Sequence, residues 1–320
     1  MTLKKSADMI IRTCMGAKPG ESVLIVTDKC TDERIAQAFF DAAVDADCEA
    51  LLLTMKPRTQ HGEEPPLVVA EAMRSADVIL APTSKSITHT KARQNACKMG
   101  ARAATLPGIT MDMMTSGGMT ADYGKMGAVA KEVFEALDGA QEIRVTTELG
   151  TDVVFDVEGC EWKDDTGNCT VPGSMSNLPA GELFVAPANV NGIVVIDGAM
   201  GGLGLLDKPI VIEVENGNAV RFSGKRADDL ETIIDRAGPD ARNVAELGIG
   251  INPAARLIGV ILEDEKVGGT VHMALGDNST FGGNVSVELH LDGIITGPKV
   301  YVDGVDLRVE RLAGFSSVDD

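Results

Sequence analysis

Aromatic residues and histidines are scarce in this sequence, and long apolar runs are missing. Aromatic side chains make up 3% of the 320 residues, and there are four histidines. No stretch approaches the roughly 20 apolar residues that a membrane-spanning helix requires. The six cysteines form no Cys-x-x-Cys pair, and the N-terminal segment lacks the long apolar core of a secretory signal. We therefore expect a cytoplasmic protein with reduced, mostly buried thiols and no membrane partner.

Positively charged residues are also few. The chain has 29 Lys and Arg residues against 48 Asp and Glu residues, a formal net charge of -19. A surface of this sign repels phosphate backbones and anionic lipids, so nucleic acid is excluded as a natural partner. An acidic surface is compatible with binding cations, although solubility alone also accounts for bulk charge. The expected partner is a small molecule or a peptide.

The N-terminal part, residues 1–140, alternates helical periodicity with short apolar runs. Because these runs are apolar on both faces and separated by helices, they predict a parallel sheet flanked by helices, an α/β domain. The expected helices span about 4–16, 32–46, 66–75 and 91–99, and the expected strands span 22–27, 49–54 and 77–81.

The C-terminal part, residues 141–320, has a different pattern. Short β-branched runs are joined by Gly, Asp and Asn turns, which is typical of antiparallel structure. The expected strands span 142–147, 153–157, 192–197, 210–214 and 219–222, and 228–237 predicts a helix. We place the domain boundary where Asp138-Gly139 closes the last N-terminal helix, and we expect a mainly antiparallel β, or α+β, second domain.

Two of the four histidines lie in the C-terminal part, close to a carboxylate. Residues i and i+2 of a strand point to the same face, so His290 and Asp292 can aim at one point. An imidazole and a carboxylate are suitable ligands for Zn, Mn, Co or Fe. With His272 on a neighbouring strand, three donors converge and leave positions open for water or substrate. Taken alone, the pair is more typical of a hydrogen-bonded histidine and a turn-capping aspartate than of a metal site.

Two glutamates extend this candidate metal site. Glu182 and Glu246 both stand in apolar sequence rich in Gly and Pro rather than in a charged face. A carboxylate in such surroundings is costly to bury unless it meets a cation. An exposed turn position is the competing interpretation for each glutamate.

Five motifs along the second half resemble those of a known family. The segments are NLPAGELFVAP at 177–187, AELGIGINP at 245–253, LEDEK at 262–266, GTVHMALGDN at 269–278 and LHLDG at 289–293. Together they resemble the metallopeptidase family of aminopeptidases T and S. The resemblance places metal ligands at Glu182, Glu246, His272, His290 and Asp292. It implies an aminopeptidase-like hydrolase with two Zn, Co or Mn ions that acts on peptide N-termini or small amides, as a homodimer.

The resemblance has one departure. Ser279 stands where the peptidases carry a catalytic tyrosine, seven positions after the first ligand histidine. Ser279 is therefore the candidate catalytic residue at that position, together with Glu182, since one glutamate can act as a proton shuttle. The departure weakens the peptidase interpretation more than it weakens metal binding.

A second branch of the same superfamily gives the alternative function. The chain is similar to 2,5-dihydroxypyridine dioxygenases, in which two histidines and an aspartate hold one non-heme Fe(II). That resemblance places the iron on His272, His290 and Asp292 and implies ring cleavage of a hydroxylated heteroaromatic. It also makes His89 a candidate acid or base, although Thr88, His89 and Thr90 equally suit the start of a helix. A metal-binding protein without catalysis is the third hypothesis.

Overall fold

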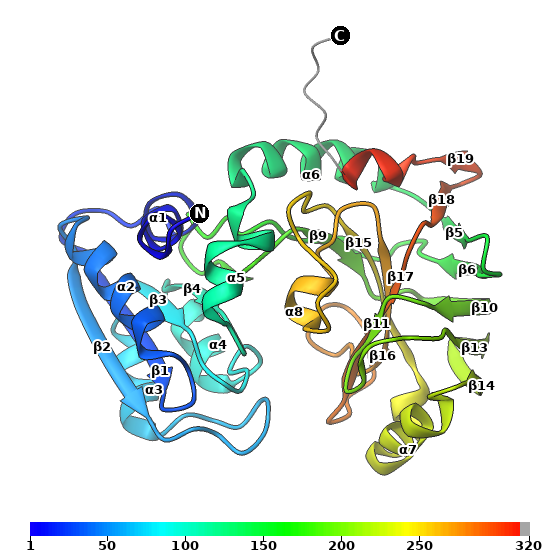
Figure 1. Cartoon of the computed structure of the whole chain (residues 1–320), viewed down its shortest axis with the longest axis horizontal. Coiled ribbons are helices and arrows are strands. Elements are labelled where there is room, and N and C mark those ends of the chain that lie inside the picture. Colours follow the sequence, from blue (N-terminus) through cyan, green and yellow to red (C-terminus); the bar gives the residue numbers. More distant parts are fainter. Residues whose placement is uncertain (314–320) are drawn as a thin grey trace, which may run out of the picture. The chain divides into compact units, whose positions relative to one another are not determined.

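The computed structural model describes residues 1–313 and divides the chain into two compact units, shown in Figure 1. Unit 1 comprises Met1–Gly127 and Asp165–Ala180, and unit 2 comprises Ala128–Asp164 and the chain from Gly181 onward. Among the described residues, no helix is long and apolar enough to cross a membrane.

Unit 1 is built on a five-stranded sheet in which every pairing is parallel. Its order is β2-β1-β3-β4-β8. The strands are β1 (Ser22–Asp28), β2 (Glu49–Met55), β3 (Val78–Ala81), β4 (Arg102–Thr105) and β8 (Met175–Asn177). The central strands β3 and β4 are buried along their whole length, as expected for a parallel sheet covered on both faces.

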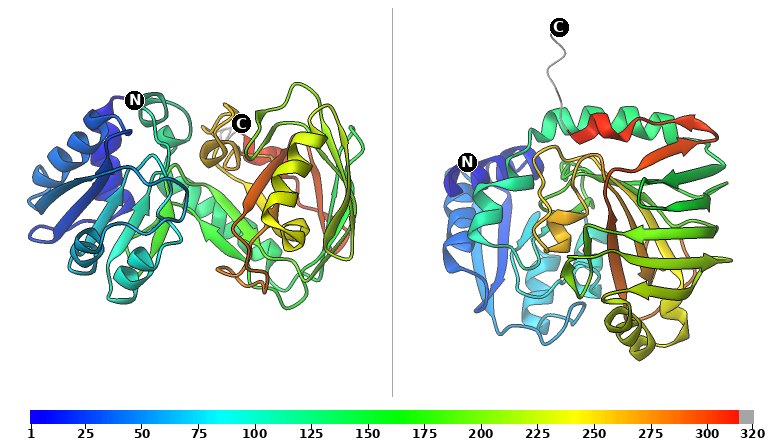
Figure 2. Two further views of the ribbon diagram at one scale, coloured as in Figure 1. Left: turned by 90° about the horizontal axis from the view of Figure 1, so that it is seen from below. Right: turned by 45° about the vertical axis from the view of Figure 1, so that its right-hand side comes forward.

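Helices cover both faces of this sheet (Figure 2). Leu24 and Val26 of β1 face one apolar cluster, to which α3 and α4 contribute Met73 and Ala96. The alternate residue Ile25 points to the opposite face, where α1 and α2 lie. The helices are α1 (Leu3–Met9), which continues as a π-helix (Ile10–Cys14), α2 (Glu33–Val44), α3 (Leu67–Arg74), α4 (Lys91–Lys98) and α5 (Met111–Thr115).

Unit 2 contains two seven-stranded antiparallel sheets. The first has the order β14-β13-β10-β6-β5-β18-β19. Its strands are β5 (Glu142–Thr146), β6 (Asp152–Asp156), β10 (Asn189–Ile196), β13 (Ile210–Glu215), β14 (Asn218–Gly224), β18 (Lys299–Val302) and β19 (Val305–Asp306). The alternating burial of β13 shows one face turned to the core.

The second sheet, here named the site sheet, has the order β12-β11-β17-β16-β15-β9-β7. Its strands are β7 (Lys163–Asp165), β9 (Glu182–Val185), β11 (Ala199–Met200), β12 (Gly204–Leu205), β15 (Val244–Gly250), β16 (Val271–Gly276) and β17 (His290–Ile295). Every residue of β15 and β16 is buried. Contact between β10 and β17 joins the two sheets, with Ile196 packed beside Gly293. The helices α6 (Tyr123–Leu137), α7 (Ala227–Ala237) and α8 (Ile261–Asp264) complete the chain.

The predicted mixture of a parallel sheet and antiparallel strands is confirmed, but the chain divides differently from the prediction. The predicted boundary at 140 ignores Asp165–Ala180, which returns to unit 1. There β8 adds a fifth parallel strand, with Thr105 opposite Asn177. Its three residues, Met-Ser-Asn, carry no apolar alternation, so only the long-range pairing with β4 makes them a strand.

Candidate metal centre

Acidic and imidazole side chains come together on one face of the site sheet. The antiparallel register places Glu182 of β9 opposite Gly250 of β15 and His272 of β16 opposite Gly248. On the next pair of strands, Ala274 lies opposite Asp292. Because side chains two positions apart share a face, Glu246, Asp292 and His290 lie on the same side as Glu182 and His272. The five predicted donor residues therefore share one face of the site sheet.

The donor atoms form two groups that share one glutamate. Glu182, Glu246 and His272 form the first group, and Glu246, His290 and Asp292 form the second, with their ligand atoms within 4.8 Å of one another. His272 Nε2 lies 3.2 Å from Glu182 Oε2 and 3.1 Å from Glu246 Oε1. His290 Nε2 lies 3.7 Å from Glu246 Oε2 and 3.3 Å from Asp292 Oδ1. Each oxygen of Glu246 thus approaches a different imidazole.

A glycine on β15 makes room for the His272 ring. A Cβ atom at Gly248 would lie 1.9 Å from His272 Nε2, far inside any permitted contact. The imidazole therefore lies across the backbone of the neighbouring strand, between the two glutamates. Its side chain is fully buried, and a β-bulge between Val244 and Glu246 sets the position of Glu246 on that strand.

His290 is oriented by the backbone and is the accessible member of the centre. Its Nδ1 lies 2.8 Å from the carbonyl oxygen of Asp277, so Nδ1–H donates there and Nε2 keeps its lone pair for a metal. The His290 side chain is 32% exposed, whereas those of Glu246 and Asp292 are each 8% exposed. Phe281 stands edge-on to the His290 ring at 5.8 Å and to Phe184 at 5.6 Å. A ligand can therefore approach from the His290 side, along an aromatic wall.

A buried lysine lies on the other side of Glu182. The side chain of Lys266 has no exposed area, and its ammonium donates to Glu182 Oε1. The same ammonium lies 2.7 Å from Glu265 Oε1. A charge buried this deeply is tolerable only because both carboxylates compensate it.

The carboxylates and imidazoles strongly perturb one another. Burial opposes charge on His290, but Asp292 and Glu246 outweigh it and raise the pKa of His290 to about 10. Burial also opposes charge on His272, yet Glu182 and Glu246 raise its pKa well above the ordinary value. Burial raises the pKa of Glu246, with partial compensation by the two histidines. Without a metal, both imidazoles are therefore held in the protonated form at neutral pH.

The donor set fits a divalent metal ion. One carboxylate oxygen in each group, Glu182 Oε2 and Asp292 Oδ1, is buried and lies beside an imidazole Nε2 without a hydrogen bond of good geometry. A buried carboxylate oxygen without a well-formed hydrogen bond costs free energy, and a bound cation would compensate both of these oxygens. Imidazole and carboxylate donors suit Zn, Mn, Co and Fe(II).

Metal binding should release protons. Because an imidazole must be neutral to ligate, binding at pH 7 is expected to free about two protons per ion, from His272 and His290. Affinity should therefore rise with pH, since protons compete with the metal for both rings. Isothermal titration calorimetry in two buffers of different ionisation enthalpy measures the number released. Identical heats in the two buffers would contradict the protonated state of the metal-free imidazoles.

Two further predicted residues lie outside the donor groups. Ser279 is exposed, and its hydroxyl donates to Asp277 Oδ1 over 2.9 Å. His89 is an exposed residue of unit 1 in the turn before α4, where its carbonyl oxygen accepts from the Gln94 side chain. The next residue, Thr90, caps α4 by accepting from the Arg93 N–H. The helix-start interpretation of this segment is confirmed for Thr90, and the catalytic roles of Ser279 and His89 stay predictions.

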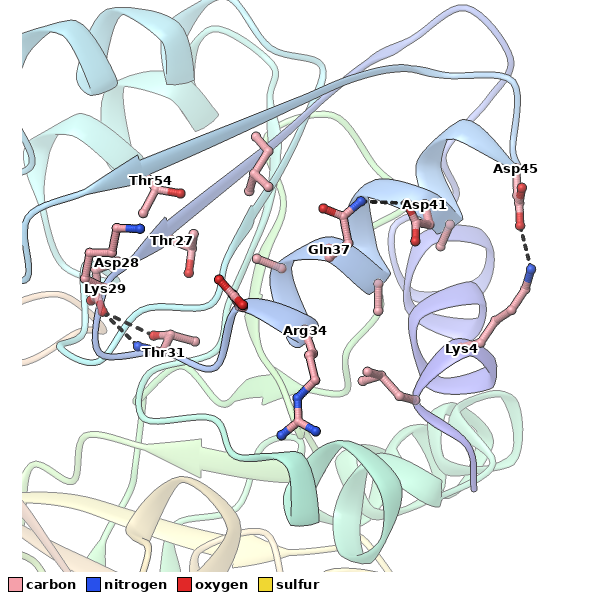
Figure 3. A pocket seen from close by; sticks show the side chains of 16 residues that line it. Lys4, Thr27, Asp28, Lys29, Thr31, Arg34, Gln37, Asp41, Asp45 and Thr54 are labelled. Atoms are coloured by element: carbon pink, nitrogen blue, oxygen red, sulfur yellow. Dashed lines mark hydrogen bonds and ion pairs between the residues drawn. The ribbon is translucent and has the colours of Figure 1, made fainter.

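Unit 1 holds a cavity of about 760 Å³ at the carboxyl ends of β1 and β2, shown in Figure 3. Thr27, Thr31 and Thr54 line it together with charged side chains. Two of these charges are already paired, Lys4 with Asp45 and Arg34 with Asp32. No histidine is among the lining residues, so this cavity offers no imidazole donor for a metal.

Residues 7–310 match the model of the family NicX, 2,5-dihydroxypyridine 5,6-dioxygenase. The chain belongs to this family. The match spans both units and includes every residue of the two donor groups. No curated protein matches the chain in sequence.

Two solved structures share the fold over nearly the whole chain. The 2,5-dihydroxypyridine dioxygenase of Pseudomonas putida KT2440 has a TM-score of 0.82 and 18% identity, covering 95% of this chain and 94% of that one. AmpT of Thermus thermophilus has a TM-score of 0.70 and 16% identity, covering 95% and 96%. The resemblance to both branches is therefore confirmed at the level of fold. The chain thus shares its fold with both solved structures.

Sequence reasoning missed Lys266, Glu265 and Gly248. The signal for the first two was an acidic and basic run, Glu263 to Lys266, between the apolar Leu262 and Val267. Gly248 gave no signal by itself, because its role depends on the strand that lies beside it.

Proposed function

We propose that this protein is a non-heme Fe(II) dioxygenase that cleaves a hydroxylated heteroaromatic ring, such as a dihydroxypyridine. The observation that carries the proposal is the placement of two imidazoles and an aspartate, His272, His290 and Asp292, on adjacent strands around Glu246. Two histidines and one carboxylate are the donor set of non-heme Fe(II) oxygenases. The family match over residues 7–310 supports the same reaction class.

His272, His290 and Asp292 would hold the iron. When bound, Fe(II) supplies the electrons that activate dioxygen and positions that accept the substrate hydroxyl groups. The protein itself supplies orientation, because the Asp277 carbonyl fixes one ring and Gly248 leaves room for the other. Both features hold Nε2 toward the centre.

The chain also supplies a proton acceptor and an apolar flank. A substrate hydroxyl must lose a proton before ring cleavage, and the Glu246 carboxylate lies between the two imidazoles with a pKa raised by burial. His89 remains the second proposed base, and His89→Gln tests it. Phe281 and Phe184 offer edges and faces on which a planar ring can lie. Phe281 thus stands beside the accessible histidine, and Phe184 stands beside Phe281.

The test is oxygen uptake by protein loaded anaerobically with Fe(II). With 2,5-dihydroxypyridine and related hydroxylated heteroaromatics, we expect one O₂ consumed per ring opened, followed with an oxygen electrode and by loss of ring absorbance. Zinc-loaded protein is the control and should consume none. No oxygen uptake across such a panel, at verified iron occupancy, would sink the proposal.

A metal-dependent aminopeptidase is the second candidate, and one observation favours it. Glu246 belongs to both donor groups, as a carboxylate shared by two ions would. When bound, two Zn, Co or Mn ions supply Lewis acidity toward an amide carbonyl and a water nucleophile. Glu182 would then act as ligand and proton shuttle. Release of nitroaniline from aminoacyl-nitroanilides by the cobalt-loaded protein, with two ions bound per chain, would favour this candidate over the first.

Oligomeric state and location complete the proposal. We propose a cytoplasmic homodimer that takes a small-molecule or peptide substrate. Light scattering of the purified protein measures the mass in solution, and a monomer at micromolar concentration would contradict the dimer.

A further inference from the structure

The buried ammonium of Lys266 is the feature that the proposed reaction leaves unused. Its side chain is 0% exposed, and it bonds to both Glu182 and Glu265. A lysine loses solvation on burial at great cost, so its position has to be compensated by charge. Glu182 therefore contacts both the ammonium of Lys266 and the imidazole of His272.

The ammonium of Lys266 already pairs with one carboxylate of the first donor group. In the first group, the Glu182 carboxylate is already ion-paired with the Lys266 ammonium, which Glu265 also contacts. In the second group, Glu246 and Asp292 both form ion pairs with His290. A second ion placed against Glu182 would therefore have to share that carboxylate with the ammonium.

The pairing with Lys266 also limits which oxygen of Glu182 is left for a metal. Glu182 offers only Oε2 to the first group, because Oε1 accepts from Lys266. A dication bound to Oε2 would share one carboxylate with an ammonium, and like charges this close in a buried, low-dielectric site repel strongly.

We propose that Lys266 is a built-in cation that takes the place of a second metal ion and thereby fixes the metal content at one ion per chain. The inference rests on the one-iron centre of the proposed function and deepens it. It makes Glu182 a positioning residue, held by Lys266 and directed at His272, rather than a ligand. It also accounts for two donor groups in a centre that works with one ion.

The test counts Co(II) ions, so it needs no substrate and no activity. Wild-type protein is loaded, desalted and analysed by mass spectrometry for metal per chain, with calorimetry for the number of sites. We expect one ion in the wild type and two in Lys266→Met, which keeps the side-chain volume but removes the charge. The double variant Lys266→Met with Glu182→Gln should return to one, because the second site loses its carboxylate. Glu265→Gln, which keeps the ammonium, should stay at one.

Each outcome decides the proposal. Two ions in the wild type would overturn it, whether or not any variant folds. One ion in a folded Lys266→Met protein, judged by circular dichroism, would overturn it as well. If Lys266→Met does not fold, Glu182→Gln decides: it keeps one ion if Glu182 is not a ligand, and binding lost or weakened tenfold or more contradicts the proposal. One ion in the wild type without oxygen uptake would refute the dioxygenase and leave the role of Lys266 intact.

Discussion

Replacing His290 with alanine is expected to abolish metal retention and activity while leaving the fold in place. His290 supplies an Nε2 donor beside Asp292 and Glu246, at distances of 3.3 Å and 3.7 Å. Replacing a residue that only orients a metal ligand lowers metal affinity by about 10–100-fold. Loss of the ligand itself should therefore lower it by more than about 100-fold. Because protonated His290 compensates the nearly buried carboxylates of Asp292 and Glu246, we expect the free energy of unfolding of the metal-free protein to fall by up to about 3–5 kcal/mol.

Metal content by mass spectrometry and thermal unfolding with and without metal measure both effects. His61→Ala is a matched control, since His61 is an exposed histidine of unit 1 outside both donor groups. That control should keep its metal and the rise in melting temperature on loading. A His290→Ala protein that still binds one ion with wild-type affinity would show that His290 is not a metal ligand.

The second large effect is expected from a single methyl group, in Gly248→Ala. The added Cβ would meet His272 Nε2 at 1.9 Å, so the buried ring must leave its place between Glu182 and Glu246. Overpacking of this kind costs about 1–3 kcal/mol of stability. Displacement of the ligand ring should lower metal affinity by about 10–100-fold, the range for changes that misorient a ligand.

Gly127→Ala is the matched control, because a Cβ at Gly127 meets nothing within 4 Å and the residue lies inside helix α6. It should be neutral or stabilising by about 0.5–1 kcal/mol. Calorimetric metal titration and chemical unfolding of both variants measure the difference. Unchanged metal affinity in a folded Gly248→Ala protein would mean that His272 does not ligate from the position seen here.

The shared glutamate and the buried lysine favour different numbers of bound metal ions. Glu246 alone suggests two ions, since each of its oxygens approaches a different imidazole. Lys266 opposes the second ion, because its ammonium already occupies one oxygen of Glu182. A one-ion centre is consistent with both observations and with the dioxygenase family to which the chain belongs. Metal count is therefore the measurement that separates the two proposed functions most directly.

The sequence by itself determined which residues can act as metal donors and on which face they lie. The spacing of His290 and Asp292 places both on one face of a strand, because side chains alternate with period two. Apolar runs on both faces predicted the parallel sheet, and β1, β2 and β3 begin and end within two residues of the predicted bounds. These features depend on local periodicity, which a single chain displays without knowledge of its partners.

Only the tertiary structure decided how the donors group and what surrounds them. The register of β15 against β16 places Gly248 under His272, and β9 brings Glu182 to the same face from 90 residues before. The contact of Lys266 with Glu182 and the return of β8 to the parallel sheet are also long-range. The local sequence around one residue of such a contact does not indicate its partner, because strand pairing and ion pairing are fixed by the fold as a whole.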